Sequence, residues 1–320
     1  MTRAVLAVAY GGAEVLEVSE VEVPEPGPGQ VLVDVRAAAY NPADWKLYGG
    51  LWGTDPAALP RRVGMECAGV VAAVGEGSRF AVGDEVVVYP ANGAFAEQVL
   101  AKETALQPKP AGLAWEQAAG LLLAGVTAWH ALEAVGLGAE RPESGADGDT
   151  PRLLVHGGAG AVGSLVVQLA LGRGVQVVAS CGASNEEYLR SLGAEPVRYG
   201  EGLTERVRSL GAVDAAIDTV GTEEAIESSV ELVADRERVA TIANFGLGAE
   251  RGVKLLGGGP GADPGTELRR AARGPLLELA AAGRLSVRIA QRFPLEQVRE
   301  AHELIRSGHA GGKVILEPQS

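Results

Sequence analysis

The chain has 320 residues, a length that suggests two domains with a sizeable core. Its 28 Lys and Arg against 41 Asp and Glu give a net charge of −13, which argues against nucleic acid and anionic membrane surfaces as partners. Glycine is frequent, with 45 residues, and the two cysteines, Cys67 and Cys181, are too few for a disulfide framework or a four-sulfur zinc site.

No segment has the pattern of a secretion signal or a membrane span. The N-terminal residues reach Gly11 and Gly12 before the apolar core of a signal peptide could form. The most apolar stretch, 118–128, is interrupted by Gly120 and Gly125 and is too short to cross a bilayer. The sequence therefore predicts a cytoplasmic protein.

The first third of the chain alternates short β-rich runs with glycine and proline turns. Residues 31–35, 67–71 and 85–88 are rich in valine and predict strands. Prolines and glycines at 24–29 and 75–84 predict turns around them. Because these runs leave no room for helices between them, they predict an antiparallel or barrel-like domain.

From about residue 113 the pattern changes to alternating helices and buried strands. Residues 113–132 and 266–282 predict helices, and residues 140–150 predict a polar loop. Apolar strands are predicted at 153–155, 175–179, 213–217 and 239–242. Such alternation is typical of a parallel sheet covered by helices. The tail, with a last strand at 313–316, is predicted to return to the first domain.

The most specific local motif is a glycine-rich loop between a predicted strand, 153–155, and a helix that starts near Ser164. A loop in this position gathers free backbone N–H groups and the positive end of a helix, which together bind a pyrophosphate. Glycine is needed because a Cβ would block the approach of the phosphate. A tight turn without a ligand is the alternative interpretation. The loop residues are Gly158, Ala159, Gly160, Ala161, Val162 and Gly163.

The residues after the second strand of this unit bear on the choice of coenzyme. An NAD site would have a carboxylate at the strand end, but here Glu186 comes only later, on the predicted helix. Ser180, Ser184 and Asn185 could instead donate hydrogen bonds to a 2′-phosphate. No Arg or Lys lies in this loop, which weakens the inference, yet the pattern still favours NADPH.

Nine segments along the chain form a specific series when they are taken in order. They are Asn41–Asp44, Gly64–Val71, Val82–Val86, Gly93–Glu97, Gly125–Trp129, His156–Gly163, Leu192–Ala194, Asp218–Gly221 and Gly312–Val314. Through them the chain resembles the medium-chain dehydrogenases/reductases over nearly its whole length. Within that superfamily it resembles the zinc-free quinone oxidoreductases of the zeta-crystallin type.

This resemblance implies an α/β fold with two domains. A Rossmann doubly wound parallel sheet over residues 122–266 would bind the dinucleotide. A GroES-like β-barrel-type catalytic domain would combine residues 1–121 and 267–320. The resemblance also implies a homodimer joined through sheet edges, for which residues 239–242 and 254–256 could supply the edge.

The resemblance further implies a set of cofactor-binding residues outside the glycine loop. Asn41 and Thr127 would flank the nicotinamide, and Tyr199 would approach the adenosine phosphate. The plainer interpretations are a turn at Asn41, a helix residue at Thr127 and a solvated edge lysine at Lys313. The implied set is Asn41, Thr127, Tyr199, Val220, Ala243, Phe245 and Lys313.

Zinc alcohol dehydrogenases of this superfamily carry metal ligands at positions where this chain has other residues. Asn41 lies near the place of the usual Cys, Met65 stands at the usual His, and no cysteine follows Tyr89. We therefore expect no bound metal. Without a Lewis acid to hold an alkoxide, simple alcohol oxidation is implausible. Quinones and carbonyl-activated C=C bonds remain, because hydride transfer alone can drive their reduction.

Asn41 and Tyr48 are the predicted catalytic residues. Related reductases often have a tyrosine at the place of Trp52, whose indole cannot act as a proton-donating acid. Tyr48 and Lys46 are the nearest alternatives, although a packed tyrosine and a surface lysine are equally compatible with the pattern. Reduction of a quinone needs no protein acid, because a quinolate can take protons from water.

Three hypotheses for function follow from these observations. The first is an NADPH-dependent reductase of quinones or enones. The second is an enoyl reductase of a polyketide or other secondary-metabolite pathway, and the third is an NADPH-binding protein with little turnover. The substrate pocket would come from the variable loops at 46–61 and 246–265, so the sequence leaves the substrate open.

Overall fold

The structure is a computed structural model that describes residues 1–138 and 150–319, so the predicted loop at 140–150 lies outside the described residues except for Thr150. The chain forms two compact units. Unit 1 consists of Met1–Leu123, Leu277–Gly283 and Val287–Ser320, and unit 2 consists of Ala124–Leu276 and Arg284–Ser286. That residues 122–266 form a dinucleotide-binding domain, and residues 1–121 with 267–320 a catalytic domain, stays a prediction. No helix in the described part of the chain is both long enough and apolar enough to cross a membrane.

Unit 1 is built mainly from antiparallel strands, as the closely spaced β-rich runs predict. Its larger sheet has the order β15-β16-β3-β5-β6-β8, with β7 also paired to β3, and its smaller sheet has the order β2-β1-β4. Only β15 and β16 pair in parallel among the described strands of this unit. The strands are β1 Thr2–Ala7, β2 Leu16–Val21, β3 Gln30–Tyr40, β4 Arg61–Arg62, β5 Cys67–Val74, β6 Glu85–Val88, β7 Gln98–Lys102, β8 Leu106–Pro108, β15 Ile289–Pro294 and β16 Lys313–Glu317. The helices are α1 Pro42–Tyr48, α2 Trp115–Ala119 and α11 Val298–Arg306.

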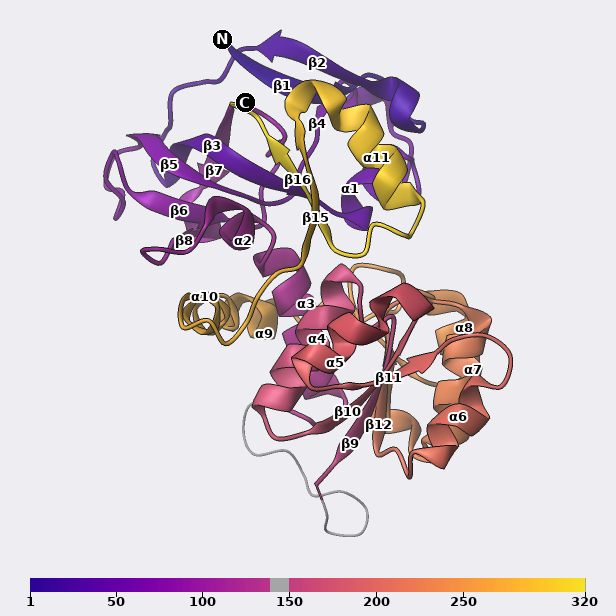
Figure 1. The fold of residues 1–320 in the computed structure, drawn as a ribbon. Helices are drawn as coiled ribbons and strands as arrows, with labels where there is room; N and C mark the ends of the chain where they lie inside the picture. Colours follow the sequence, from indigo (N-terminus) through magenta and orange to yellow (C-terminus); the bar gives the residue numbers. More distant parts are fainter. Residues whose placement is uncertain (139–149, 320) are drawn as a thin grey trace. The chain divides into compact units, whose positions relative to one another are not determined.

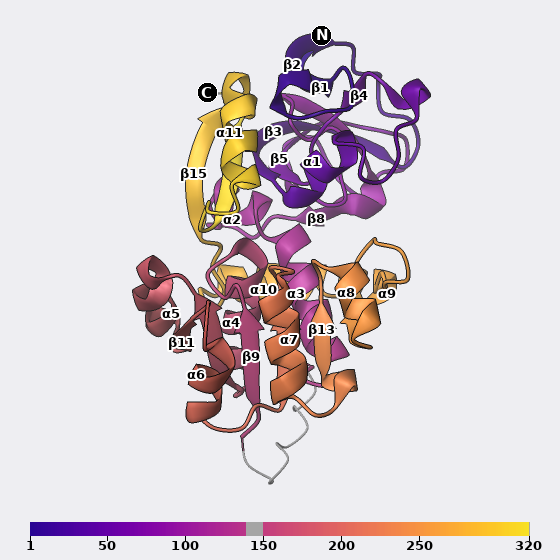
Figure 2. The same ribbon diagram turned by 90° about the vertical axis from the view of Figure 1, so that its right-hand side faces the viewer.

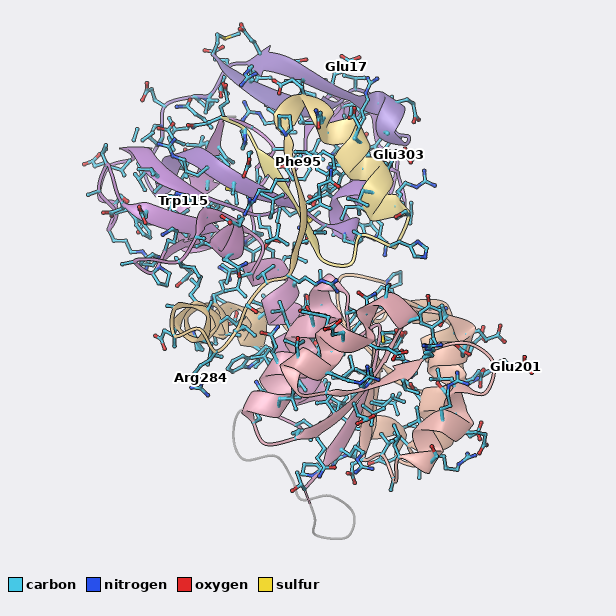
Figure 3. The ribbon with its side chains drawn as sticks, in the orientation of Figure 1. Glu17, Phe95, Trp115, Glu201, Arg284 and Glu303 are labelled. Carbon is cyan, nitrogen blue, oxygen red and sulfur yellow. The ribbon has the colours of Figure 1, made fainter. Side chains whose placement is uncertain are left out.

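The core of unit 1 gathers the inward side chains of these strands. In β3, Val31, Val33 and Val35 are fully buried, and the residues between them are not, which is the period-two pattern of a strand with one buried face. Figure 3 shows Phe95 inside the unit and the charged Glu303 on its outside. The hydrophobic pattern of the first third thus sets which face of each strand is covered.

The C-terminal segment returns to unit 1, as predicted. β16 pairs antiparallel with β3, so that Ile315 lies opposite Ala39. Helix α11 packs against β3, β15 and β16, and Figure 2 shows this yellow segment beside the indigo N-terminal strands. The pairing places Lys313, the first residue of β16, next to the end of β3.

Unit 2 contains a six-stranded sheet in which every pairing is parallel, as predicted. The strand order is β11-β10-β9-β12-β13-β14, so the direction in which successive strands are added to the sheet reverses between β9 and β12, where open α/β sheets bind ligands. Figure 1 shows this sheet between α4 and α5 on one side and α6, α7 and α8 on the other. The strands are β9 Arg152–His156, β10 Gln176–Cys181, β11 Glu195–Arg198, β12 Ala215–Asp218, β13 Val239–Thr241 and β14 Lys254–Leu255. The helices are α4 Ala161–Gly172, α5 Glu186–Leu192, α6 Leu203–Ser209, α7 Glu223–Leu232, α8 Phe245–Glu250 and α9 Thr266–Ala271.

Two predicted helices are each divided in two, and these predictions are wrong in that respect. The segment 113–132 contains α2 and the start of α3, Leu122–Ala134, with Gly120 between them. A Cβ on Gly120 would lie 3.2 Å from both the Glu116 carbonyl oxygen and Val287 Cγ1, a tight contact that favours glycine there. The segment 266–282 contains α9 and α10, Arg273–Ala281. Pro275 has no N–H to continue the hydrogen bonds of α9, but it fits in the first turn of α10.

Candidate functional site

The loop between β9 and α4 is held in one conformation by backbone hydrogen bonds. The Gly158 N–H donates to the Ser180 carbonyl at 3.0 Å, and the Gly160 N–H donates to the Gly157 carbonyl at 3.0 Å. Gly157 has a φ of +74°, in the left-handed region that only glycine adopts readily. The loop is therefore tied to the end of β10 before it enters α4.

The three predicted glycines of this loop have different surroundings. A Cβ on Gly158 would lie 2.6 Å from the Ala179 Cβ, and a Cβ on Gly163 would lie 2.2 Å from the Gly157 carbonyl oxygen. Both are therefore required by packing within unit 2. Among the described residues, a Cβ on Gly160 would meet only the Gly157 carbonyl oxygen, at 3.3 Å. Gly160 is thus the position where the backbone is open to a ligand.

Helix α4 begins directly after Gly160 and runs for 12 residues. The N–H groups in the first turn of a helix have no intrahelical acceptor, and they carry the positive end of its dipole. The first turn of α4 contains no acidic side chain. The loop and helix start, including Ala159, Ala161 and Val162, therefore fit the pyrophosphate of a dinucleotide.

The predicted polar side chains after β10 do not share one role. Ser180 is 2% exposed, and its hydroxyl accepts the Gly157 N–H and contacts His156 Nδ1, both at 3.3 Å. The predicted direct contact between Ser180 and the cofactor is thereby corrected, because this hydroxyl supports the glycine loop from within the sheet. Ser184 is exposed and Asn185 is half-buried, on the short turn Ala183–Asn185, so both are accessible to a ligand.

A cation that the sequence analysis missed lies beside the end of β10. Arg198, the last residue of β11, is in register with Cys181, the last residue of β10. The next residue, Tyr199, is exposed, and its hydroxyl lies 3.3 Å from where a Cβ on Gly182 would be. Parallel strands end on the same side of a sheet, so a prediction of β11 could have placed Arg198 here. The four residues of β11 are too few to give a clear periodic pattern.

Asp218, at the end of β12, organises the other loops on the same side of the sheet. One carboxylate oxygen accepts the N–H groups of Val220 and Gly221, both at 2.9 Å. The other accepts the Thr241 hydroxyl at 2.7 Å, at the end of β13. The predicted segment from Ala243 to Phe245 follows directly. Unit 2 thus gathers the glycine loop, Val220 and this segment at the carboxyl ends of its strands.

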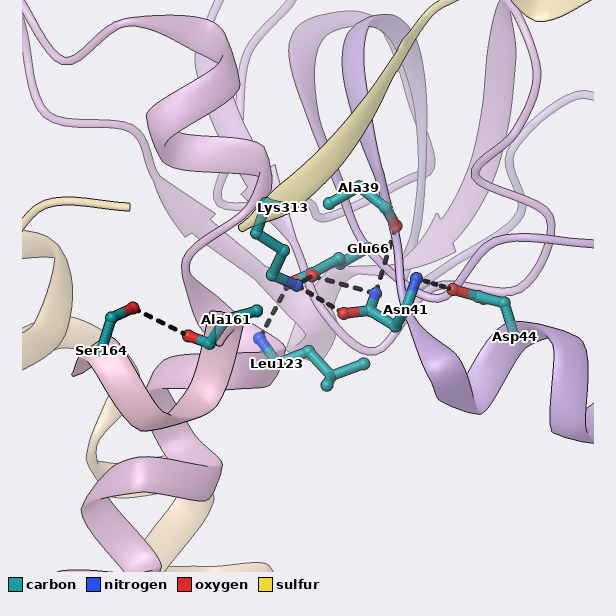
Figure 4. A network of polar contacts seen from close by, with 8 residues as sticks. All are labelled: Ala39, Asn41, Asp44, Glu66, Leu123, Ala161, Ser164 and Lys313. Carbon is teal, nitrogen blue, oxygen red and sulfur yellow. Dashed lines mark hydrogen bonds and ion pairs between the residues drawn. The ribbon is translucent and has the colours of Figure 1, made fainter. Parts of the chain in front are cut away.

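Asn41, Glu66 and Lys313 form a buried polar network in unit 1 (Figure 4). The Asn41 amide nitrogen donates to the Ala39 carbonyl and to Glu66 Oε1, both at 3.1 Å, and the amide oxygen accepts from Lys313 Nζ. Lys313 Nζ also donates to Glu66 Oε1 at 2.6 Å, and Glu66 Oε2 accepts the Leu123 N–H at 2.8 Å. Four segments far apart in the sequence therefore meet at this carboxylate.

Burial makes the charges of this network depend on each other. The side chains of Glu66 and Lys313 are 0% and 2% exposed. Two charges removed from water persist only if they stay paired and hydrogen-bonded. The alternative of a solvated edge lysine at Lys313 is therefore wrong. Asn41 is held in one orientation, because its amide group is bonded on both its nitrogen and its oxygen.

Asp44 extends the network along α1. Its Oδ2 accepts the Asn41 N–H at 2.8 Å, and its Oδ1 has no hydrogen-bond partner among the described residues. Burial raises the pKa of Asp44 to about 7, against the effect of the Asn41 N–H and with a further contribution from the nearby Glu66 carboxylate. Asp44 therefore changes its protonation near neutral pH.

The position of Tyr48 corrects the prediction that it supplies a proton. Its side chain is fully buried, and its hydroxyl contacts the Tyr40 hydroxyl and His302 Nδ1. Burial also raises the pKa of Tyr48 above its ordinary value. A general acid has to reach the atom that it protonates, whereas this hydroxyl is enclosed by unit 1. Tyr48 is therefore a core residue.

The remaining predicted residues divide between the two units. Thr127 lies on α3 in unit 2 and is 8% exposed, whereas Asn41 and Lys313 belong to unit 1. Within residues 1–138 and 150–319, no group of three or more His, Cys, Asp and Glu side chains is placed to hold a metal ion. A divalent cation beside Glu66 would also be repelled by the Lys313 ammonium.

Two family models match the chain. Residues 27–131 match the alcohol dehydrogenase GroES-like domain, which confirms the predicted GroES-like fold, and residues 192–316 match the zinc-binding dehydrogenases. The second description includes zinc, but the side chains that the structure describes do not fit a zinc site.

Named relatives are similar to the chain over different shares of its length. The chloroplastic quinone-oxidoreductase QR1 of Triphysaria versicolor is 29% identical over an alignment that covers 99% of both proteins. The chloroplastic NADPH-dependent alkenal/one oxidoreductase of Arabidopsis thaliana is 37% identical over 58% of this chain and 49% of that protein. Other curated quinone oxidoreductases are matched over 55–57% of their own length. The solved structure of Escherichia coli quinone oxidoreductase complexed with NADPH superposes with a TM-score of 0.84 at 25% identity, covering 99% of this chain and 100% of that chain.

The buried ion pair predicts a specific pattern of stability. Replacing Lys313 by Met leaves the Glu66 carboxylate buried without its cation, so we expect the free energy of unfolding to fall by about 3–5 kcal/mol. The double variant Lys313→Met/Glu66→Gln removes both charges and should recover part of that loss. Chemical denaturation followed by circular dichroism measures both, with the exposed Lys102→Met as the matched control. A single variant as stable as this control would contradict the interpretation.

Proposed function

We propose that this chain, which belongs to the zinc-free quinone-oxidoreductase branch of the medium-chain dehydrogenases/reductases, reduces quinones or α,β-unsaturated carbonyl compounds with NADPH. The observation that carries the proposal is the loop at Gly160. There the backbone is open to a phosphate at the start of α4, while Gly158 and Gly163 are closed by packing. Relatives named for quinone and alkenal/one reduction, and an NADPH complex among the structural neighbours, support it.

The preference for NADPH rests on the charges at the end of β10. No carboxylate stands at the strand end itself, and Arg198, in register with the last residue of β10, and the exposed Ser184 are the proposed contacts of a 2′-phosphate. A guanidinium recognises phosphate through paired N–H donors. The proposed cofactor contacts are Asn41, Thr127, Gly158, Ala159, Gly160, Ala161, Val162, Gly163, Ser184, Asn185, Arg198, Tyr199, Val220, Ala243, Phe245 and Lys313.

When bound, NADPH supplies the hydride. The chain's own residues bind and orient the reactants: the glycine loop holds the pyrophosphate, and Glu66 and Lys313 fix Asn41. Because the Asn41 amide is already bonded within unit 1, it would offer the nicotinamide a rigid surface. No acidic side chain is assigned to the reaction, since water can protonate the quinolate.

The glycine loop predicts a loss of coenzyme binding without a loss of folding. In Gly160→Val the added side chain would fill the space that a phosphate needs, whereas within the protein it meets one carbonyl oxygen that a small shift relieves. We expect NADPH binding, measured by fluorescence titration, to disappear while the melting temperature stays within a few degrees of the wild type. Gly172→Val, at the far end of α4 with no described atom near its Cβ, is the matched control. Wild-type affinity in Gly160→Val would remove the basis of the proposal.

Turnover should occur without metal. We expect NADPH absorbance to fall on addition of quinones, with enones as the second substrate class, and we expect a chelator to leave the rate unchanged. Elemental analysis of the purified protein should find zinc well below one atom per chain. One tightly bound zinc per chain, or binding of NADPH without turnover of any acceptor in the panel, would contradict the assignment.

We also propose a homodimer formed through the edge of the unit 2 sheet. β14 is the last strand of that sheet, and among the described residues Asp263 lies beside it, bridging to Leu256 and donating its N–H to the Leu255 carbonyl at 2.8 Å. Strand edges tend to be paired or covered. Light scattering should therefore give twice the 32.8 kDa of one chain. A monomer at micromolar concentration would exclude this assembly.

A further inference from the structure

One carboxylate joins two arginines beside the end of β10. Glu186, the first residue of α5, receives Arg198 Nε on Oε1 at 2.5 Å and Arg190 Nη2 on Oε2 at 3.1 Å. The two arginine side chains are 65% and 58% exposed, whereas that of Glu186 is 19% exposed. Glu186 therefore occupies the inner position of an otherwise accessible cluster.

This cluster lies near the strand end to which the proposed coenzyme, NADPH, would bring its 2′-phosphate. Arg198 is in register with Cys181 at the end of β10, and Ser184 stands two residues before Glu186. In doubly wound folds the 2′ position of the adenosine ribose comes to this strand end. The Glu186 carboxylate and a 2′-phosphate would thus compete for the same guanidinium donors.

Resting on the proposed function, we propose that Glu186 determines coenzyme selectivity by competing with the 2′-phosphate for Arg198 and Arg190. NADPH binding requires Arg198 to exchange a carboxylate for a phosphate, so part of the gain from the new ion pair is offset by the loss of the old one. NADH has no such phosphate and leaves the cluster unchanged. Hydrogen bonds from Arg198 and then Arg190 hold the pKa of Glu186 below its ordinary value, so this competitor is charged throughout the neutral range.

The matched pair of variants Glu186→Gln and Glu187→Gln tests this inference. Glu187 is the exposed next residue on the same turn, so its substitution changes net charge equally without touching the two ion pairs. We expect Glu186→Gln to tighten NADPH binding about tenfold, with NADH changed less than about twofold, and Glu187→Gln to leave the ratio of the two unchanged. Fluorescence titration measures both coenzymes, and calorimetry with 2′,5′-ADP and 5′-AMP isolates the contribution of the phosphate.

The variant Arg198→Gln extends the test to the cation itself. It should weaken NADPH about tenfold and leave NADH unchanged, and in Glu186→Gln/Arg198→Gln the gain from Glu186→Gln should shrink, because only Arg190 then remains to be released. Equal changes for NADPH and NADH, or an unchanged ratio in Glu186→Gln, would overturn the role of Glu186 while leaving the proposed reductase standing. A wild-type chain that binds neither NADPH nor 2′,5′-ADP would instead overturn the proposed function as well.

Discussion

The interior of unit 1 depends on the pairing of one buried carboxylate, that of Glu66. It receives hydrogen bonds from Asn41 at the end of β3, from the Leu123 N–H at the start of α3 and from Lys313 at the start of β16. A charge removed from water has to be compensated inside the protein, so these three partners cannot be exchanged for solvent. The return of the C-terminal strand is therefore an electrostatic requirement as well as a matter of sheet pairing. The rigid orientation of Asn41 follows from the same constraint.

In unit 2 the constraint acts on the glycine loop between β9 and α4. This loop has to be fixed in one conformation and still stay accessible to a ligand. Gly158 and Gly163 lie against Ala179 and the Gly157 carbonyl, which holds the loop close to β10. Ser180 and His156 support it from inside the sheet, and burial lowers the pKa of His156, so this support is neutral near pH 7. Gly160 alone of these three loop glycines faces open space among the described residues. Packing and ligand access are thus divided between neighbouring positions.

The proposed hydride transfer needs no acidic or nucleophilic side chain. The coenzyme is proposed to be bound by backbone N–H groups and by surface arginines, in a chain whose net charge is −13. For binding of the coenzyme phosphate, local positive charge therefore matters more than the net charge of the chain. Arg198 and Arg190 supply this charge, and the Glu186 carboxylate beside them reduces their attraction for a phosphate. Selectivity between coenzymes then becomes a difference between two ion pairs, which a single residue such as Glu186 can shift.

The sequence by itself determined the longer apolar strands, the parallel and antiparallel halves, the glycine loop and the return of the tail. Shorter strands such as the four-residue β11 carry no clear periodic pattern and were not predicted. The sequence did not predict the division of two helices. At the first division Gly120 packs tightly against Val287, which lies 167 positions away in the chain. Only the tertiary structure decided the roles of single side chains. It enclosed Tyr48 against Tyr40 and His302, turned the Ser180 hydroxyl toward the loop and buried Lys313 against Glu66. It also brought Arg198 to the end of β10, because sheet register joins residues that have no fixed spacing in the sequence.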